Sequence, residues 1–266
     1  MTLTADKRQI ARAASIVMVA FALSRVLGLI RQVTIAGQFG TGREMDAYQA
    51  AFRLPDIIFQ LVAGGALASA FIPTFTGYLT RADRAGAWRL ASAIVNLLLA
   101  ILTLTAALAA LIAPWLVDWI IAPGFDAETA ALTTRLMRVM LISSVVFGVS
   151  GVVMGALNAH QHFILPAVAP MLYNLAIIGG ALFLAPPFGV MGLAVGVVVG
   201  SALHLLIQLP ALAHFRARYT PVLTVRDPGV RQVARLMGPR VLGLAVVQLN
   251  FLVNTNLASR LGEGAV

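Results

Sequence analysis

Three arginines interrupt segments that are otherwise apolar enough to cross a membrane. Arg25 and Arg31 lie in the first apolar segment, and Arg53 lies in the second. A charge at the centre of a bilayer costs roughly 2.5–3.5 kcal/mol, so three lipid-facing arginines would cost on the order of 10 kcal/mol. The chain avoids most of this cost if the three side chains face a water-filled cavity or polar partners. A cationic cavity predicts an anionic cargo, because the planar guanidinium donates two parallel hydrogen bonds to a phosphate.

The first segment gathers its polar residues on one helical face. At about 100° per residue, Ser24 nearly overlaps Arg31, and Arg25 nearly overlaps Gln32. Gly28 lies between them. The functional interpretation is that this face forms one wall of an anion-binding cavity. The alternative is that Arg25 extends to the membrane surface, or pairs with an aspartate, for purely structural reasons.

The second segment carries a polar stripe at helical spacing. Its members follow one another at intervals of three or four residues: Asp46, Gln49, Arg53, Asp56, Gln60 and Gly64. Such a stripe inside a membrane segment predicts a face turned to water or protein, with the aspartates partly neutralising the arginines. The alternative is an exposed helix that precedes the membrane, with the true span starting near Ile57.

Four residues are candidate hinges. Pro55 removes a backbone donor and should bend its helix. Gly64 and Gly65 allow either flexibility or close helix packing, and Gly28 lies at the centre of the arginine face.

The composition is that of a membrane protein. Of 266 residues, 60% are hydrophobic and 11% are charged, which a soluble domain of this size cannot accommodate. The absence of cysteine excludes disulfides and thiolate metal sites. The net charge of +9 does not indicate nucleic-acid binding, because the basic residues fall between apolar runs. His160 and His162 lack a nearby carboxylate, so no metal site is expected.

The apolar runs predict an all-α, polytopic membrane protein. Seven segments are long enough to span, and they lack the period-two alternation of barrel strands. They cover residues 13–36, 46–78, 88–117, 135–157, 166–186, 189–213 and 236–260.

The basic residues predict an orientation. Alternate connecting segments are rich in arginine and lysine, which places the N-terminus and those segments in the cytoplasm. These residues are Lys7, Arg8 and Arg12, then Arg81, Arg84 and Arg89, then Arg216, Arg218, Arg226, Arg231 and Arg235.

A sequence echo predicts the domain organisation. Residues 25–29 (Arg-Val-Leu-Gly-Leu) recur as residues 240–244, so the seventh span restarts the pattern of the first, as in repeat-built transporters. We therefore expect a six-helix lobe over 1–215 and a cytoplasmic linker over 216–235. A short amphipathic helix starting at Asp227-Pro228 is expected in that linker. Residues 236–266 would be the first helix of a second lobe, so the chain is expected to be incomplete.

Several of these runs resemble the MurJ (MviN) family of lipid II flippases. The matching stretches include SRVLGLIR over 24–31, FGTG over 39–42, AFRLPD over 51–56, and APGF over 122–125. Further matches extend to Met237-Gly238-Pro239, so the resemblance covers the whole chain. Its most specific part is the first eighty residues.

The resemblance implies transport rather than catalysis. It suggests a monomeric, multi-pass protein of the bacterial cytoplasmic membrane that moves lipid II between leaflets by alternating access among membrane lipids. Essential family arginines match Arg25 and Arg31, and a family aspartate matches Asp46. Many members carry arginine and glutamate where this chain has Gln60 and Gly64, so the charge network differs there. No cofactor is expected, and an ion gradient or the membrane potential would drive transport.

Three alternatives remain open. One is an exporter of the same superfamily for another polyprenyl-linked saccharide or a cationic drug, although a drug carrier should show cavity carboxylates instead of arginines. The second is an intramembrane enzyme on polyprenyl phosphates, for which the sequence offers no paired aspartates or suitably partnered histidine. The third is a non-transport scaffold, which would need no inward-facing arginines.

Overall fold

The computed structural model describes residues 2–62, 65–261 and 264, and within these ranges all regular structure is helical. The helices are α1 (Thr2–Phe39), α2 (Arg43–Val62), α3 (Gly65–Thr80), α4 (Arg84–Leu111), α5 (Ala113–Leu116), η1 (Val117–Ile121), α6 (Ala127–Ala159), α7 (Ile164–Gly179), η2 (Gly180–Leu184), α8 (Ala185–Phe188), α9 (Met191–Leu206), α10 (Leu209–His214) and α11 (Pro228–Ala258). The predicted all-α class is confirmed.

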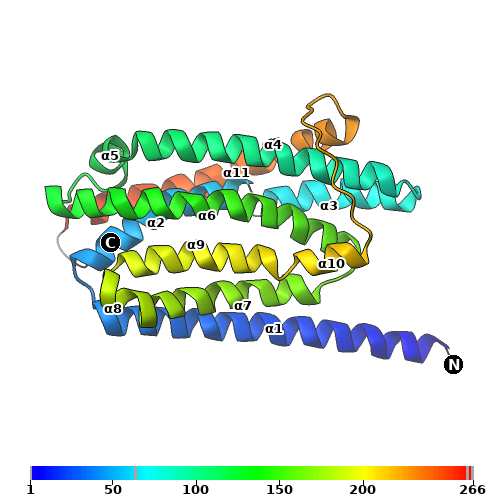
Figure 1. Ribbon diagram of the computed structural model, residues 1–266, viewed down its shortest axis with the longest axis horizontal. Coiled ribbons are helices and arrows are strands. Elements are labelled where there is room, and N and C mark those ends of the chain that lie inside the picture. The colour runs from blue at the N-terminus through cyan, green and yellow to red at the C-terminus, as the bar shows by residue number, and fades with distance from the viewer. Residues whose placement is uncertain (1, 63–64, 262–263, 265–266) are drawn as a thin grey trace.

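Six helical segments of the described chain are long and apolar enough to cross a membrane. They are Val17–Phe39, Arg84–Leu111, Ala127–Ala159, Ile164–Phe188, Met191–His214 and Pro228–Ala258. The predicted second span, 46–78, consists of α2 and α3, which follow one another along the length of the bundle (Figure 1). Neither qualifies alone, because α2 carries the polar stripe and α3 has only 16 residues.

Connections alternate between the two ends of the bundle. The N-terminus, the α3–α4 turn, the α6–α7 turn and the linker after α10 share one end (Figure 1). The α1–α2 turn, α5, α8 and the C-terminus lie at the other end. The arginine-rich segments therefore gather at one end, as the charge pattern predicts.

Aspartates begin three of the long helices. Asp83 accepts a hydrogen bond from the Gly86 N–H, and Asp126 accepts one from the Thr129 N–H. Asp227 accepts from the N–H groups of residues 229 and 230, so the predicted cap is confirmed. The helix that it starts is not short, however. It continues as α11 through Pro239 to Ala258, so the last part of the predicted linker is the beginning of the membrane helix.

Close backbone contact joins α7 and α9. Three glycines at four-residue spacing on α9, namely Gly192, Gly196 and Gly200, face the α7–η2–α8 segment. A Cβ at Gly196 would lie 3.1 Å from the Ala176 carbonyl oxygen, and one at Gly200 would lie 2.9 Å from the Tyr173 carbonyl oxygen. Small residues let membrane helices approach in this way, since lipid offers no hydrophobic driving force for association.

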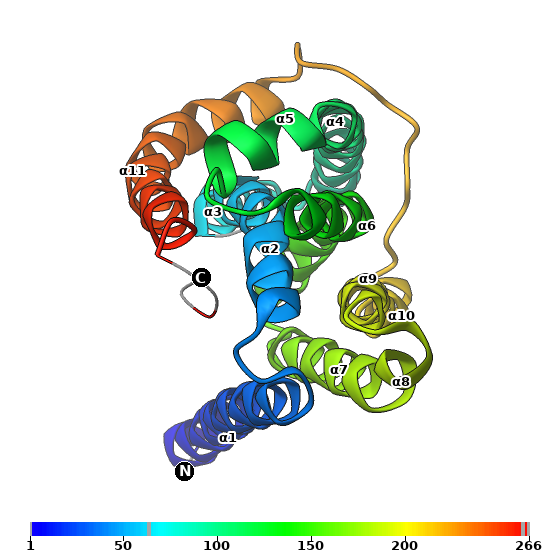
Figure 2. The same cartoon turned by 90° about the vertical axis from the view of Figure 1, so that its left-hand side faces the viewer.

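The outer helices α1 and α11 flank a core centred on α6. The helix α6 packs against α2, α3, α4 and α9, whereas α1 packs mainly on α7 and α11 mainly on α3 (Figure 2). Only 11% of the most apolar stretch of α1 and 6% of that of α11 are buried. Both helices therefore expose long apolar faces.

Candidate functional site

A pocket of about 130 Å³ lies between α1 and α2. We call it the arginine pocket. Its lining comes from α1 (Arg31, Gln32, Ile35) and from α2 (Met45, Tyr48, Gln49, Phe52, Arg53, Asp56). Two arginines against one aspartate give this lining a formal charge of +1. The helical spacing of the polar stripe is what brings Gln49, Arg53 and Asp56 to one side of α2.

The two arginines of this pocket have unsatisfied donors. The Nε atoms of Arg31 and Arg53 are buried, and neither has a hydrogen-bond partner among the described residues. A buried N–H without an acceptor costs roughly 1–3 kcal/mol, and more on a charged group. An anionic oxygen entering the pocket would remove that cost and would meet two guanidinium groups at once.

Neighbouring side chains hold the wall of the pocket. Gln60 Nε2 donates to Asp56 Oδ2 over 3.2 Å, which fixes the carboxylate one helical turn from Arg53. From α11, the ring of Phe251 lies 5.9 Å from Arg53 Cζ, a cation–π distance. No motif or spacing in the sequence points to Phe251, because its position beside Arg53 depends on how α11 crosses α2.

The rest of the predicted face on α1 lies outside the arginine pocket. Arg25 is exposed and does not line it. Ser24 is half-buried, and its carbonyl oxygen accepts a hydrogen bond from Asn174 Nδ2 on α7 over 3.3 Å. At Gly28, no described atom beyond its own stretch of α1 lies within 4 Å of where a Cβ would be, so this side of α1 is open. The structure therefore groups Arg31 with Gln32 and separates them from Ser24 and Arg25.

Asp46 also lies outside the pocket. It is 3% exposed, and its Oδ2 accepts a hydrogen bond from the Gly264 N–H over 2.6 Å. The carboxylate thus ties the chain beyond α11 to the first turn of α2. Nearby, the Gly124 N–H donates to Ser259 Oγ and Asn256 Nδ2 donates to the Ile120 carbonyl oxygen, so the end of α11 is fastened at this end of the bundle.

The candidate hinges lie in different settings. Pro55 is buried inside an unbroken α2, and its carbonyl oxygen accepts a hydrogen bond from Ser144 Oγ on α6 over 3.2 Å. Gly65 is the first residue of α3, and Gly64 lies outside the described residues. Gly28 lies within the continuous α1. Their role as hinges stays a prediction.

Single polar residues within the spans serve as hydrogen-bond partners. Asn174 connects α7 to α1, and His204 Nδ1 on α9 lies 2.7 Å from Ser150 Oγ on α6, so both residues form interhelical contacts. Asn96 differs, because it donates to the Val222 carbonyl oxygen of the linker instead of to another helix.

A family model and curated relatives of this chain point to the same protein family. A family model described as "Lipid II flippase MurJ" matches residues 35–266. Lipid II flippase MurJ of Burkholderia cenocepacia is 35% identical over 252 residues, which cover 92% of this chain and 49% of that protein. A probable lipid II flippase MurJ of Haemophilus influenzae is 32% identical over 258 residues, covering 92% of this chain and 50% of that protein.

Solved structures agree with this result. A lipid II flippase MurJ in an inward closed conformation superposes with a TM-score of 0.79 at 25% identity, covering 93% of this chain and 51% of that one. An inward-facing multidrug MATE transporter of the MOP superfamily gives a TM-score of 0.72 at 18% identity, covering 91% and 55%, and therefore shares the fold alone. The chain spans about half the length of the curated relatives it matches.

Proposed function

The chain belongs to the MurJ family of lipid II flippases, and on that premise we propose that it is the part of a lipid II flippase that binds the diphosphate of the cargo. The proposal rests on one observation: the buried Nε atoms of Arg31 and Arg53 lie in one cationic pocket, and neither finds a hydrogen-bond partner within residues 2–62, 65–261 and 264. The matched family is one of membrane transporters and not of catalysts. The chain is accordingly a polytopic helical protein of the bacterial inner membrane.

In this proposal, the arginine pocket receives the phosphates of lipid II. Each guanidinium can donate two parallel hydrogen bonds to phosphate oxygens, and Asp56 limits the excess positive charge so that the cargo can leave again. Phe251 would move with α11 and thereby change the surroundings of Arg53 between the two states of alternating access.

The polyprenyl tail would stay in lipid along α11. Leu242, Val246, Leu249 and Val253 are all exposed, and their spacing of three or four residues places them on one side of this helix. That apolar face lies on the helix that contributes Phe251 beside Arg53, so head and tail of one cargo molecule could be held together.

Arg25 would make a second contact with the cargo. It lies six residues before Arg31, roughly 9 Å along the axis of α1, and its side chain is exposed. Asp46, Ser24 and Gln32 complete the proposed set, with Gln32 in the pocket wall and the other two supporting the helices around it.

Transport would need no bound cofactor. A charge that crosses the membrane potential responds with roughly 2.3 kcal/mol per 100 mV, so the potential or an ion gradient can drive the cycle. We propose that the protein acts as a monomer. We also propose that its N-terminus lies in the cytoplasm, because the arginine-rich connections share the N-terminal end of the bundle.

Complementation tests this function. The full-length protein is expressed in bacteria depleted of their own flippase, with Arg31→Ala, Arg53→Ala and the control Arg135→Ala, whose exposed side chain lies on α6 outside the pocket. We expect Arg135→Ala to restore growth and the two pocket variants to fail at equal membrane levels. Rescue by both pocket variants would remove the proposal.

Charge and geometry can be separated in the same cells. Arg31→Lys keeps the positive charge but loses the planar fork. We expect partial rescue, with lipid II accumulating in the inner leaflet. The unmodified protein can also be tested in cells that lack the exporter of another polyprenyl-linked saccharide. If it restores export of that saccharide and not growth of the flippase-depleted cells, the pocket belongs to the alternative cargo.

A further inference from the structure

A second cationic pocket lies at the arginine-rich end of the bundle, away from α1 and α2. Its volume is about 350 Å³. We call it the basic pocket. It is lined by Arg84, Ala85 and Trp88 of α4 and by Phe215, Arg216, Arg218 and Thr220 of the linker, and this lining contains no acidic residue.

The three arginines of the basic pocket are available to a ligand. All are exposed, and among the described residues none forms an ion pair. Asp83, the residue before Arg84 in the chain, accepts a hydrogen bond from the Gly86 N–H at the start of α4. Three arginines and two aromatic residues, Trp88 and Phe215, therefore line the same hollow.

The linker that forms one side of this pocket is fastened to α4. Asn96 Nδ2 donates to the Val222 carbonyl oxygen over 2.9 Å, and the Tyr219 hydroxyl donates to Asn96 Oδ1 over 2.8 Å. The Thr220 N–H donates to Ser92 Oγ over 3.1 Å. The arginines are thus held on a fixed backbone against the helix.

An apolar groove begins on the other side of the same linker. Its volume is about 700 Å³, and it is lined by Asn96, Leu99, Ala100, Thr103, Leu104 and Ala107 of α4 with Tyr219, Pro221, Val222 and Leu223 of the linker. Along α4 the lining runs from Asn96 to Ala107, a rise of roughly 16 Å at 1.5 Å per residue, close to the length of a fatty acyl chain. Leu104 and Leu223 are 62% and 65% exposed, so the groove is open to lipid.

We propose that the basic pocket and this groove form one binding site for an anionic glycerophospholipid. The phosphate would lie among Arg84, Arg216 and Arg218, and one acyl chain would follow the groove along α4. Basic pockets between membrane helices on the cytoplasmic side are suited to anionic headgroups, and the apolar groove explains why the ligand is a lipid and not free phosphate. A bound lipid would hold the linker that joins α10 to α11 against α4.

The binding test uses purified full-length protein in detergent, with native mass spectrometry of lipid adducts. The probes are phosphatidylglycerol, phosphatidylcholine and sn-glycerol 3-phosphate. We expect phosphatidylglycerol to bind most tightly. Each neutralised arginine should weaken it about five-fold, so Arg216→Gln with Arg218→Gln should weaken it roughly 25-fold.

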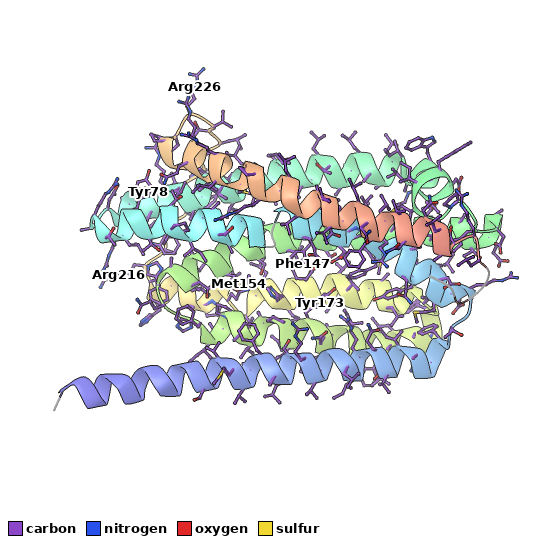
Figure 3. The ribbon with its side chains drawn as sticks, turned by 180° about the vertical axis from the view of Figure 1, so that it is seen from behind. Tyr78, Phe147, Met154, Tyr173, Arg216 and Arg226 are labelled. Carbon is purple, nitrogen blue, oxygen red and sulfur yellow. The ribbon has the colours of Figure 1, made fainter. Side chains whose placement is uncertain are left out.

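A matched control removes the same charge elsewhere. Arg226 and Arg235 are exposed and lie outside the basic pocket, and Figure 3 shows Arg226 at the tip of the linker, well separated from Arg216 at the same end of the bundle. Arg226→Gln with Arg235→Gln should leave affinity within about two-fold of the original, since it removes only distant surface charge. Equal losses in the two double variants would overturn the proposal.

The groove is tested separately. Ala100→Trp fills the groove from an exposed position, and Ala131→Trp places the same ring on an exposed position of α6. We expect only Ala100→Trp to lower the affinity for phosphatidylglycerol, at unchanged melting temperature.

Equal affinity for phosphatidylcholine, or binding of glycerol 3-phosphate as tight as that of phosphatidylglycerol, would also contradict a lipid site. If the double glutamine variant does not fold, the single Arg218→Gln and its expected five-fold loss decide the question.

Discussion

Arginines are used in two ways in this chain. Arg43 pairs with Asp126 over 3.7 Å, and Arg138 Nε donates to the Ala110 carbonyl oxygen, so both have local structural partners. The Nε atoms of Arg31 and Arg53 are buried and have no such partner in the part of the chain that the structure describes. Buried donors are nearly always satisfied in native proteins, and the exceptions are expected at functional sites. This contrast is why we propose a binding role for Arg31 and Arg53 and not for Arg43 or Arg138.

Part of the arginine pocket follows from local periodicity. Arg53 and Asp56 share a face because three residues make nearly one helical turn, and this predicts their common wall without any knowledge of packing. The exposure of Arg25 and the arrival of Phe251 depend on where α7 and α11 pack, and the sequence of α1 carries no information about either.

Asp126 should make stability depend on pH. The Thr129 N–H, and more weakly Arg43, hold the pKa of this carboxyl below its usual range. A lowered pKa stabilises the folded state above about pH 4, and this contribution is lost as the pH falls through the folded-state pKa. We expect the melting temperature to drop between about pH 5 and pH 3, and to drop less in Asp126→Asn. Parallel curves for the two proteins would contradict this assignment.

The elements show why span boundaries are harder to predict than spans. The stretch 46–78 contains Pro55 and Pro73, yet both lie inside helices: Pro55 in α2, which ends at Val62, and Pro73 in α3, which begins at Gly65. A proline kinks a helix without necessarily ending it, because neighbouring helices can satisfy the freed groups. Likewise, the cap at Asp227 fixed where α11 starts but not how far it continues.

The glycines of α9 should matter more than their neighbours. Gly196→Leu would place a side chain against the Ala176 carbonyl oxygen and the Gly180 backbone, so α7 and α9 would have to separate. We expect a loss of about 1–3 kcal/mol or more in unfolding free energy. Val199→Leu, on the exposed side of the same helix, should change it by less than about 0.5 kcal/mol. The measurement is denaturant unfolding in detergent, and similar losses in both variants would argue against close packing here.

At the scale of the whole molecule, the outer helices α1 and α11 are covered unevenly compared with the rest of the bundle. The apolar faces of α1 and α11 are the least covered, and the chain spans about half the length of its relatives. The echo of residues 25–29 at 240–244 predicts that α11 begins a second repeat, and this stays a prediction.

The orientation can be measured with single cysteines, because this chain has none. Arg226→Cys lies at the linker end, and Glu128→Cys lies at the opposite end, both exposed. In cells expressing the otherwise cysteine-free full-length protein, a membrane-impermeant maleimide should label the Glu128→Cys variant directly. It should label the Arg226→Cys variant only after permeabilisation. The reverse pattern would place the N-terminus outside.

The central claim concerns direct binding of the cargo by the arginine pocket. Affinity for lipid II is measured with purified full-length protein for the original sequence, the double variant Arg31→Ala with Arg53→Ala, and the control Arg135→Ala. A hydrogen bond to a charged group contributes about 1.5–3 kcal/mol, so the double variant should bind at least about 100-fold more weakly. The control should stay within about two-fold, since one screened surface charge contributes little. A double variant that binds lipid II as tightly as the control would show that the phosphates are held elsewhere.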